Sequence, residues 1–197
     1  MRNYFISYNL SDNINYLYLF MLYGIAEYDK TKRRYETITF NSKKDLAEKI
    51  KNAYGEKAFS YATLNRILSA PNYSNYFSIK GNTLTLNNDF TNRTKSAQKP
   101  FVIITSVEAD FLLRQNNKLL ASYYCYLKHY CGLSSKAGIK QDSTAKQFLL
   151  SVGLSADNHN NLSRISSYNT LLVNEGLIKI DKFRDQNGNE RNNYFIL

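Results

Sequence analysis

The chain repeats one order of secondary-structure elements in its two halves, and this constrains its fold more than any other feature. In each half the pattern predicts an aromatic-rich helix, a short strand, a helix that follows a serine, a further helix, and two strands joined by a turn with Gly and Asn. A five-residue segment also recurs with one difference, as SYATL at 60–64 and SYNTL at 167–171. A match this short can arise by chance, so the shared order of elements carries the inference of two copies of one small fold.

The first half contains the elements of one copy. Apolar residues recur at helical spacing over 15–28, which predicts a helix with a wide apolar surface. The β-branched and aromatic run at 35–40 predicts a strand, and Ser42 after it is a typical residue to cap the next helix. A further helix is expected over 60–68, followed by two strands around a Gly-Asn turn at 81–82.

The second half repeats this order with additional helix in front of it. Tyrosine and leucine recur along one helical stripe, a serine again precedes a helix, and an Asn-Gly turn joins the last two strands. The patterns predict helices over 107–114, 118–130, 143–152 and 161–174, and strands over 138–141, 177–183 and 191–197.

A polar stretch without helical or strand periodicity separates the two copies. It ends at a proline, and we expect a linker there, at residues 91–100. The linker would divide a first domain at 1–90 from a second at 101–197, each of the common size of a small domain. A short strand would open each copy, at 4–7 and at 101–104.

Helix, strand, helix, helix and a two-stranded hairpin is the element order of a winged helix-turn-helix. We therefore expect a mainly α fold with small β-hairpins, of the α+β class, built from two winged helix-turn-helix domains in tandem. In such a fold the second helix of the pair enters the major groove of DNA. Two such domains in one chain would act as a monomeric pseudo-dimer, or the chain would form a homodimer.

The exit from the last helix carries the most specific motif. Leu172 is followed by three residues and then by Gly-Leu-Ile at 176–178, so that the helix ends at a glycine and a strand begins at once. Together with the preceding helix pair and the terminal hairpin, this passage resembles the winged-helix domains of replication and DNA-maintenance proteins from Gram-positive plasmids and phages. The resemblance covers residues 101–197 and, more loosely, 4–90. It implies DNA binding in the replication, conjugation or maintenance of a mobile element.

The chain is strongly basic. Its formal net charge is +10, with 14 Lys/Arg against 8 Asp/Glu in residues 1–97 and 12 against 8 in residues 98–197. A basic surface spread over folded modules suits a long polyanion such as double-stranded DNA, although solubility alone would also explain the charge. The longest apolar run, at 16–25, is too short to span a bilayer, and no signal-peptide core is present. These features indicate a cytoplasmic protein without a membrane partner.

The sequence contains no recognisable catalytic motif. It lacks the phosphate-binding loop of ATPases, and His129 and His159 do not form the paired histidines of rolling-circle nickases and relaxases. The carboxylates are scattered rather than clustered for two-metal chemistry. Cys125 and Cys131 lie six residues apart and form no Cys-x-x-Cys pair, which argues against a zinc site. We expect a non-catalytic protein with no metal and no cofactor.

We expect the main DNA contacts on the exposed face of the second helix in each pair. In the helix over 161–174, the apolar positions leave small hydroxyls and one arginine on the opposite side, almost without acidic residues. Such side chains read base edges in the major groove, whereas an ordinary solvated face usually mixes Glu with Lys. The residues assigned to these faces are Ser163, Arg164, Ser167 and Thr170 in the second half, and Thr63, Asn65 and Arg66 in the first.

We expect contacts to the phosphate backbone from helix starts and from the hairpins. Free backbone N–H groups and nearby cations at a helix start suit phosphate, although capping alone explains the serines equally well. In the last hairpin, Asp185 and Glu190 lie beside the cations and leave open a salt-bridged tip with no role in binding. The residues assigned are Lys43, Lys44, Ser143, Lys146 and Asn160 at helix starts, and Lys80, Lys182, Arg184 and Arg191 in the hairpins.

These observations favour a sequence-specific double-stranded DNA-binding protein of a mobile element. It would act in plasmid or phage replication, conjugative DNA processing or transcriptional control, and the fusion of two readers would raise affinity without new contacts. One alternative is a protein-interaction module that docks a replication or transfer partner, which should not shift a DNA duplex at physiological salt. Another is an RNA-binding protein, which would prefer single strands or hairpins.

Overall fold

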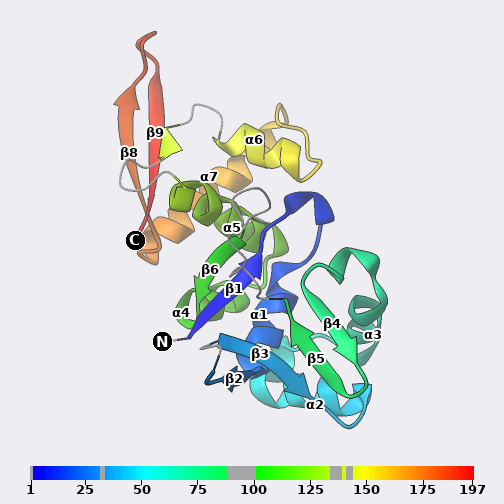
Figure 1. Cartoon of the computed structure of the whole chain (residues 1–197). Helices are drawn as coiled ribbons and strands as arrows, with labels where there is room; N and C mark the ends of the chain where they lie inside the picture. The colour runs from blue at the N-terminus through cyan, green and yellow to red at the C-terminus, as the bar shows by residue number, and fades with distance from the viewer. Residues whose placement is uncertain (1, 32–33, 88–100, 134–138, 141–143) are drawn as a thin grey trace, which may run out of the picture. The chain divides into compact units, whose positions relative to one another are not determined.

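The computed structural model describes residues 2–31, 34–87, 101–133, 139–140 and 144–197. It has a mixed α+β fold in which the strands form small sheets, which confirms the expected class (Figure 1). The chain divides into two compact units, Met1–Ala121 and Ser122–Leu197.

The division between the units differs from the expected one. β1 (Asn3–Ser7) pairs antiparallel with β6 (Phe101–Thr105) along its whole length. Both strands bury alternate apolar side chains, and in the described ranges neither has another strand partner, so the pairing satisfies backbone groups that would otherwise stay open. The first unit therefore extends well past residue 100, instead of the division into 1–90 and 101–197. The expected linker at 91–100 lies outside the described residues.

The first unit combines a four-stranded sheet with several helices. The strand order is β2-β3-β5-β4, and all neighbouring strands are antiparallel. Its elements after β1 are α1 (Tyr16–Ile25), β2 (Glu27–Asp29), β3 (Arg34–Thr39), α2 (Lys43–Tyr54), α3 (Tyr61–Ser69), β4 (Phe77–Lys80), β5 (Thr83–Leu86), β6 and α4 (Ser106–Gln115). Short 3-10 turns lie at Leu10–Asp12, Gly55–Lys57 and Pro71–Tyr73.

α1 is shorter than the sequence predicts. The apolar spacing predicts a helix over 15–28, but residues 27–29 form β2 and pair with β3. This part of the prediction was wrong because pairing with a neighbouring strand outweighs local helical periodicity. The remaining helix is buried on most sides, as its wide apolar surface predicts.

Two serines cap the helix pair of the first unit: Ser42, as the sequence predicts, and Ser60, which the sequence placed inside its helix. Ser42 Oγ accepts a hydrogen bond from the backbone N–H of Asp45, and Ser60 Oγ accepts one from that of Thr63, both at 3.2 Å. Each bond satisfies a backbone donor that the first turn leaves open. Both helices then direct their apolar stripes into the core, through the buried side chains of Leu46, Ile50, Leu64 and Ile67.

The second unit combines three helices with a three-stranded sheet. α5 (Lys118–Leu133) contains the boundary between the units and contributes its residues from Ser122 onward. It is followed by β7 (Ile139–Lys140), α6 (Thr144–Ser151), α7 (His159–Asn174), β8 (Ile178–Arg184) and β9 (Glu190–Ile196). The strand order is β7-β9-β8. An aromatic core joins the helices, with ring centroids 5.0 Å apart for Tyr123 and Phe148 and 6.4 Å apart for Tyr123 and Tyr168.

The repeated order of elements is also a repeated topology. In the first unit, β3 precedes the helix pair α2–α3 and pairs with β5, the last strand of the following hairpin. In the second unit, β7 precedes α6–α7 and pairs with β9 in the same way. In both sheets the last hairpin strand thus lies between the strand before the helix pair and the first hairpin strand.

The five-residue match does not belong to this repeat. Ser60 caps the start of α3, whereas Ser167 lies in the middle of α7. The tyrosines that follow differ accordingly: Tyr61 is 49% exposed and Tyr168 is 7% exposed. The two segments occupy different positions in their helices, so the two units are related by their order of elements and strand order and not by this match.

Candidate nucleic-acid interface

α7 presents the face that the sequence predicts. Ile165, Tyr168 and Leu172 are buried against the rest of the second unit. Asn158 caps the start of the helix, where its side chain accepts a hydrogen bond from the backbone N–H of Asn160 at 2.9 Å. Along one exposed face, at spacings of three and four residues, lie Asn160, Ser163, Arg164, Ser167 and Thr170.

The side chains on this face can form hydrogen bonds, and together they carry a single positive charge. Ser167 Oγ donates to the carbonyl of Ser163 at 3.1 Å, and Thr170 Oγ1 donates to that of Ser166 at 3.2 Å. The hydroxyl protons are therefore engaged within the helix, and the oxygens stay available as acceptors. Arg164 has no hydrogen-bond or ion-pair partner within the described part of the chain. α7 contains no Asp or Glu that could neutralise it.

α3 offers a smaller exposed surface. Of its three assigned residues, Arg66 is exposed, while Thr63 and Asn65 are half-buried. Thr63 Oγ1 also accepts a hydrogen bond from the capping Ser60 at 3.1 Å. Tyr61 is half-exposed at the start of this helix, and the sequence interpretation missed it. The sequence could have indicated this exposure, because Tyr61 lies at the edge of the helical stripe that contains Leu64 and Ile67.

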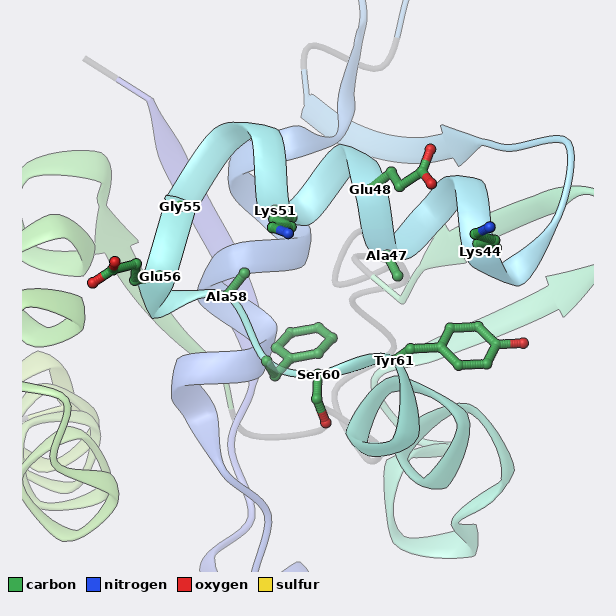
Figure 2. Close-up of a pocket in the computed structure, with 10 residues that line it drawn as sticks. Lys44, Ala47, Glu48, Lys51, Gly55, Glu56, Ala58, Ser60 and Tyr61 are labelled. Atoms are coloured by element: carbon green, nitrogen blue, oxygen red, sulfur yellow. The ribbon is translucent and has the colours of Figure 1, made fainter.

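A pocket beside α3 was also missed. It has a volume of about 630 Å³ and lies between one face of α2 and the chain that leads into α3 (Figure 2). Its floor is largely apolar. Two lysines and two glutamates surround it, so the rim of the pocket carries both positive and negative charges. Its lining residues are Lys44, Ala47, Glu48, Lys51, Gly55, Glu56, Ala58, Phe59, Ser60 and Tyr61.

The residues assigned to helix starts have different surroundings. Lys43 and Lys44 are exposed at the start of α2, and Lys44 borders the pocket. Lys146 in α6 forms an ion pair with Asp157 at 3.4 Å, with both side chains mostly exposed, so the pair is weak and available for exchange. Ser143 lies outside the described residues.

The hairpin cations are mostly paired. In the β8–β9 hairpin, Lys182 forms an ion pair with Glu190, and Arg191 Nε donates to Asp185 Oδ2 at 2.9 Å. This is the salt-bridged tip that the sequence left open as an alternative. Among the described residues, Arg184 in this hairpin has no such partner. In the first unit, Lys80 is exposed at the end of β4.

The described ranges contain no group of three or more His, Cys, Asp or Glu side chains placed to hold a metal ion. None of their helices has both the length and the apolar character needed to cross a membrane. Cys125 is buried and Cys131 is half-buried, and neither is part of a disulfide.

No protein-family model, curated protein or solved structure matches this chain.

Proposed function

We propose that this chain is a sequence-specific double-stranded DNA-binding protein built from two winged helix-turn-helix units. The element order and strand order shared by the two units support this assignment, since they are those of a winged helix-turn-helix. In this reading α3 and α7 are the recognition helices, and the β4–β5 and β8–β9 hairpins are the wings. The non-catalytic role expected from the sequence is part of the same proposal.

The exposed face of α7 is the observation that carries the proposal. Arg164 is an unpaired guanidinium among hydroxyl acceptors, and no carboxylate lies on the helix to repel phosphate or occupy the cation. A guanidinium in the major groove can bind O6 and N7 of guanine with two hydrogen bonds, while hydroxyl oxygens accept from the amino groups of cytosine or adenine. A helix of 16 residues is about 24 Å long, which is enough to follow the groove over several base pairs.

The charge of the chain supports a polyanionic partner. Residues 1–121 carry 17 Lys/Arg against 10 Asp/Glu and residues 122–197 carry 9 against 6, so each unit would be attracted to the same duplex. Joining the two units in one chain gives the second a high effective concentration once the first is bound. Such a protein would serve a mobile element in plasmid or phage replication, conjugative DNA processing or transcriptional control, in the cytoplasm.

A second candidate function rests on the first unit. Its pocket has an apolar floor, charges of both signs and the half-exposed Tyr61, which together suit a protein segment better than a phosphate backbone. In this alternative, the first unit docks a replication or transfer partner while the second unit reads DNA, or neither unit binds DNA.

Selection from a pool of random duplexes separates these functions. The DNA-binding proposal predicts that the full chain enriches one motif at about 0.15 M salt, in a pool that also contains single-stranded DNA and RNA as competitors. Enrichment of no duplex motif would refute it and favour the protein-interaction module. Enrichment of single-stranded RNA would instead favour the RNA-binding alternative.

A further inference from the structure

The pocket between α2 and the start of α3 has the size of a small-molecule site. Its volume of about 630 Å³ lies within the range of roughly 300–1,000 Å³ that is usual for ligand pockets. A stable protein–protein interface, by comparison, usually buries about 800 Å² on each partner over a broad surface. A single hollow of this volume therefore fits one compact molecule better than an extended protein surface.

The walls of the pocket are held by contacts within the chain. The ring of Phe59 packs against Tyr18 of α1, with the ring centroids 4.9 Å apart. Ser60 Oγ accepts a hydrogen bond from the backbone N–H of Thr63 at 3.2 Å and donates one to Thr63 Oγ1 at 3.1 Å, which fixes the start of α3. Because these walls are already ordered, a ligand would bind with little further ordering of side chains.

The inner surface of the pocket is apolar and aromatic. Ala47 on α2 and Ala58 on the chain that leads into α3 line two of its sides, and their small side chains leave the space between them open (Figure 2). Phe59 and Tyr61 add aromatic rings to the lining. Such rings pack against other flat apolar groups at centroid separations of about 4.5–7 Å. The lining therefore favours a ligand with a flat apolar body.

The charged side chains of the rim differ in their orientation. Lys44, Ala47 and Lys51 are spaced by three and four residues, so they share the face of α2 that lines the pocket. Figure 2 shows the carboxylates of Glu48 and Glu56 directed away from the space between α2 and the start of α3. None of these four charged side chains forms an ion pair with another described residue. The two ammonium groups are therefore available to an acidic group in the pocket.

Both lysines can reach the same acidic group. Seven residues separate them, which corresponds to about 10.5 Å along the helix axis. Each ammonium group is carried on a flexible four-carbon stem, so the two can converge from the ends of the pocket over its centre. The lining thus combines an apolar floor with positive charge on one side, which is complementary to a molecule that is apolar at one end and acidic at the other.

We propose that this pocket binds a small organic anion that regulates the first unit. The flat apolar body of the anion lies against Phe59 and Tyr61, and its acidic group lies beside Lys44 and Lys51. Binding would neutralise two cations next to α3 and so weaken the attraction of this unit for a duplex. The regulatory step rests on the proposed DNA binding, whereas the binding of the anion does not.

Two fluorescent probes that differ in one charged group test the site. Anilinonaphthalene sulfonate has an aromatic body with one negative charge, and phenylnaphthylamine has the same body without the charge. The affinity of the full chain for each probe is measured by fluorescence titration at about 0.15 M salt. The change that a substitution causes in one affinity, divided by the change in the other, isolates the contribution of the charge.

Substitution of the two lysines tests the assignment of the charge. Lys44→Gln/Lys51→Gln should weaken the anionic probe by about 3- to 10-fold and the neutral probe by less than about 2-fold, because each exposed charge contact contributes a few-fold in affinity. Lys43→Gln/Lys57→Gln is the matched control, since it removes two charges from the same segment without changing the lining of the pocket. In this control both affinities should stay nearly unchanged.

Substitution of the two alanines tests the location. Ala47→Leu/Ala58→Leu fills the pocket from two sides and should weaken both probes by about 10-fold or more, because the aromatic body loses its buried area. An unchanged far-UV circular dichroism spectrum would show that the helices of this variant are intact. The two lysine variants test the same site without altering its volume.

Duplex binding in the presence of the anionic probe tests the regulatory step. At saturating probe, the affinity of the native chain for the selected duplex should fall by about 2- to 5-fold, because two cations near the DNA are neutralised. The affinity of Ala47→Leu/Ala58→Leu for the same duplex should not respond to the probe.

Four results would overturn parts of this inference. An equal loss of both probes in Lys44→Gln/Lys51→Gln would remove the role of charge, and unchanged binding of both to the filled variant would place them elsewhere on the chain. If the native chain binds neither probe, the pocket is not a small-molecule site and a protein segment is its better occupant. A duplex affinity that does not change at saturating probe would remove the regulation. The probe titrations contain no DNA, so they fail or succeed independently of the proposed function.

Discussion

Replacement of Gly24 by alanine should destabilise the first unit. Gly24 lies in α1, and a Cβ added there would be 1.7 Å from the hydroxyl oxygen of Tyr54 and 3.0 Å from its Cζ. Tyr54 ends α2 and is half-buried, so turning its ring away from Gly24 would expose part of a side chain that the fold covers. The missing side chain at Gly24 thus allows α2, and the helix pair that it begins, to approach α1.

The expected magnitude follows from two opposing effects. Alanine is favoured over glycine inside a helix by about 1 kcal/mol. Forcing extra volume into a packed site costs about 1–3 kcal/mol, and a separation of 1.7 Å is far below any contact distance, which places the cost in the upper part of that range. We therefore expect a net loss of about 1–2 kcal/mol. In a small domain this lowers the Tm by several degrees, since 1 kcal/mol corresponds to about 4–8 °C.

A double-mutant cycle followed by urea and thermal unfolding measures this clash. Tyr54→Phe removes the offending oxygen and should leave stability nearly unchanged by itself. The double variant Gly24→Ala/Tyr54→Phe should recover a large part of the loss seen in Gly24→Ala, and a residue of it should remain because Cζ stays 3.0 Å from the added Cβ. If Gly24→Ala is as stable as the native chain or more stable, as helix propensity alone predicts, then α1 and α2 do not pack as described.

Three further outcomes are expected. If two units neutralise about 5–8 phosphates, log affinity for duplex DNA should fall with log salt at a slope of about −4 to −7, and a slope near zero would favour the protein-interaction alternative. Arg184→Ala should weaken binding to cognate and scrambled duplexes about equally in a titration of both, because a backbone contact carries no base identity; a loss confined to the cognate duplex would contradict this. Burial raises the pKa of Tyr126 from 10.0 to about 12, so the stability that it contributes is present below pH 10 and is lost as pH rises toward 12. Tyr126→Phe should therefore flatten the fall in Tm between pH 10 and 12, and an unchanged fall would show that this phenol does not control it.

Local signals in the sequence were sufficient to predict the helices that position the site. The apolar spacing and the capping residues are properties of neighbouring residues, and Ser42 caps α2 as expected. The exposed face of α7 could be predicted for the same reason, because helical geometry fixes which side chains lie opposite Ile165 and Leu172.

Features that depend on distant residues could not be predicted. The strand pattern at 4–7 indicates a strand but not its partner, and β1 pairs with β6 about a hundred residues away. The same limit explains β2, which forms through pairing with β3 where the local pattern favours helix. At the hairpin tip, the sequence placed Asp185 near several cations, but only the loop geometry selects Arg191 as its partner.

The binding of Arg164→Ala to DNA tests the central claim most directly. Affinities of the native chain and the variant are compared on the selected duplex and on a scrambled duplex, with Arg114→Ala on α4 as a control that removes the same charge elsewhere. We expect Arg164→Ala to weaken cognate binding by about 10- to 100-fold and to relax the preference at one base pair, because a bidentate contact to guanine contributes about 1–3 kcal/mol. Arg114→Ala should change both affinities only slightly. If Arg164→Ala leaves both affinities unchanged, α7 is not the helix that reads the sequence.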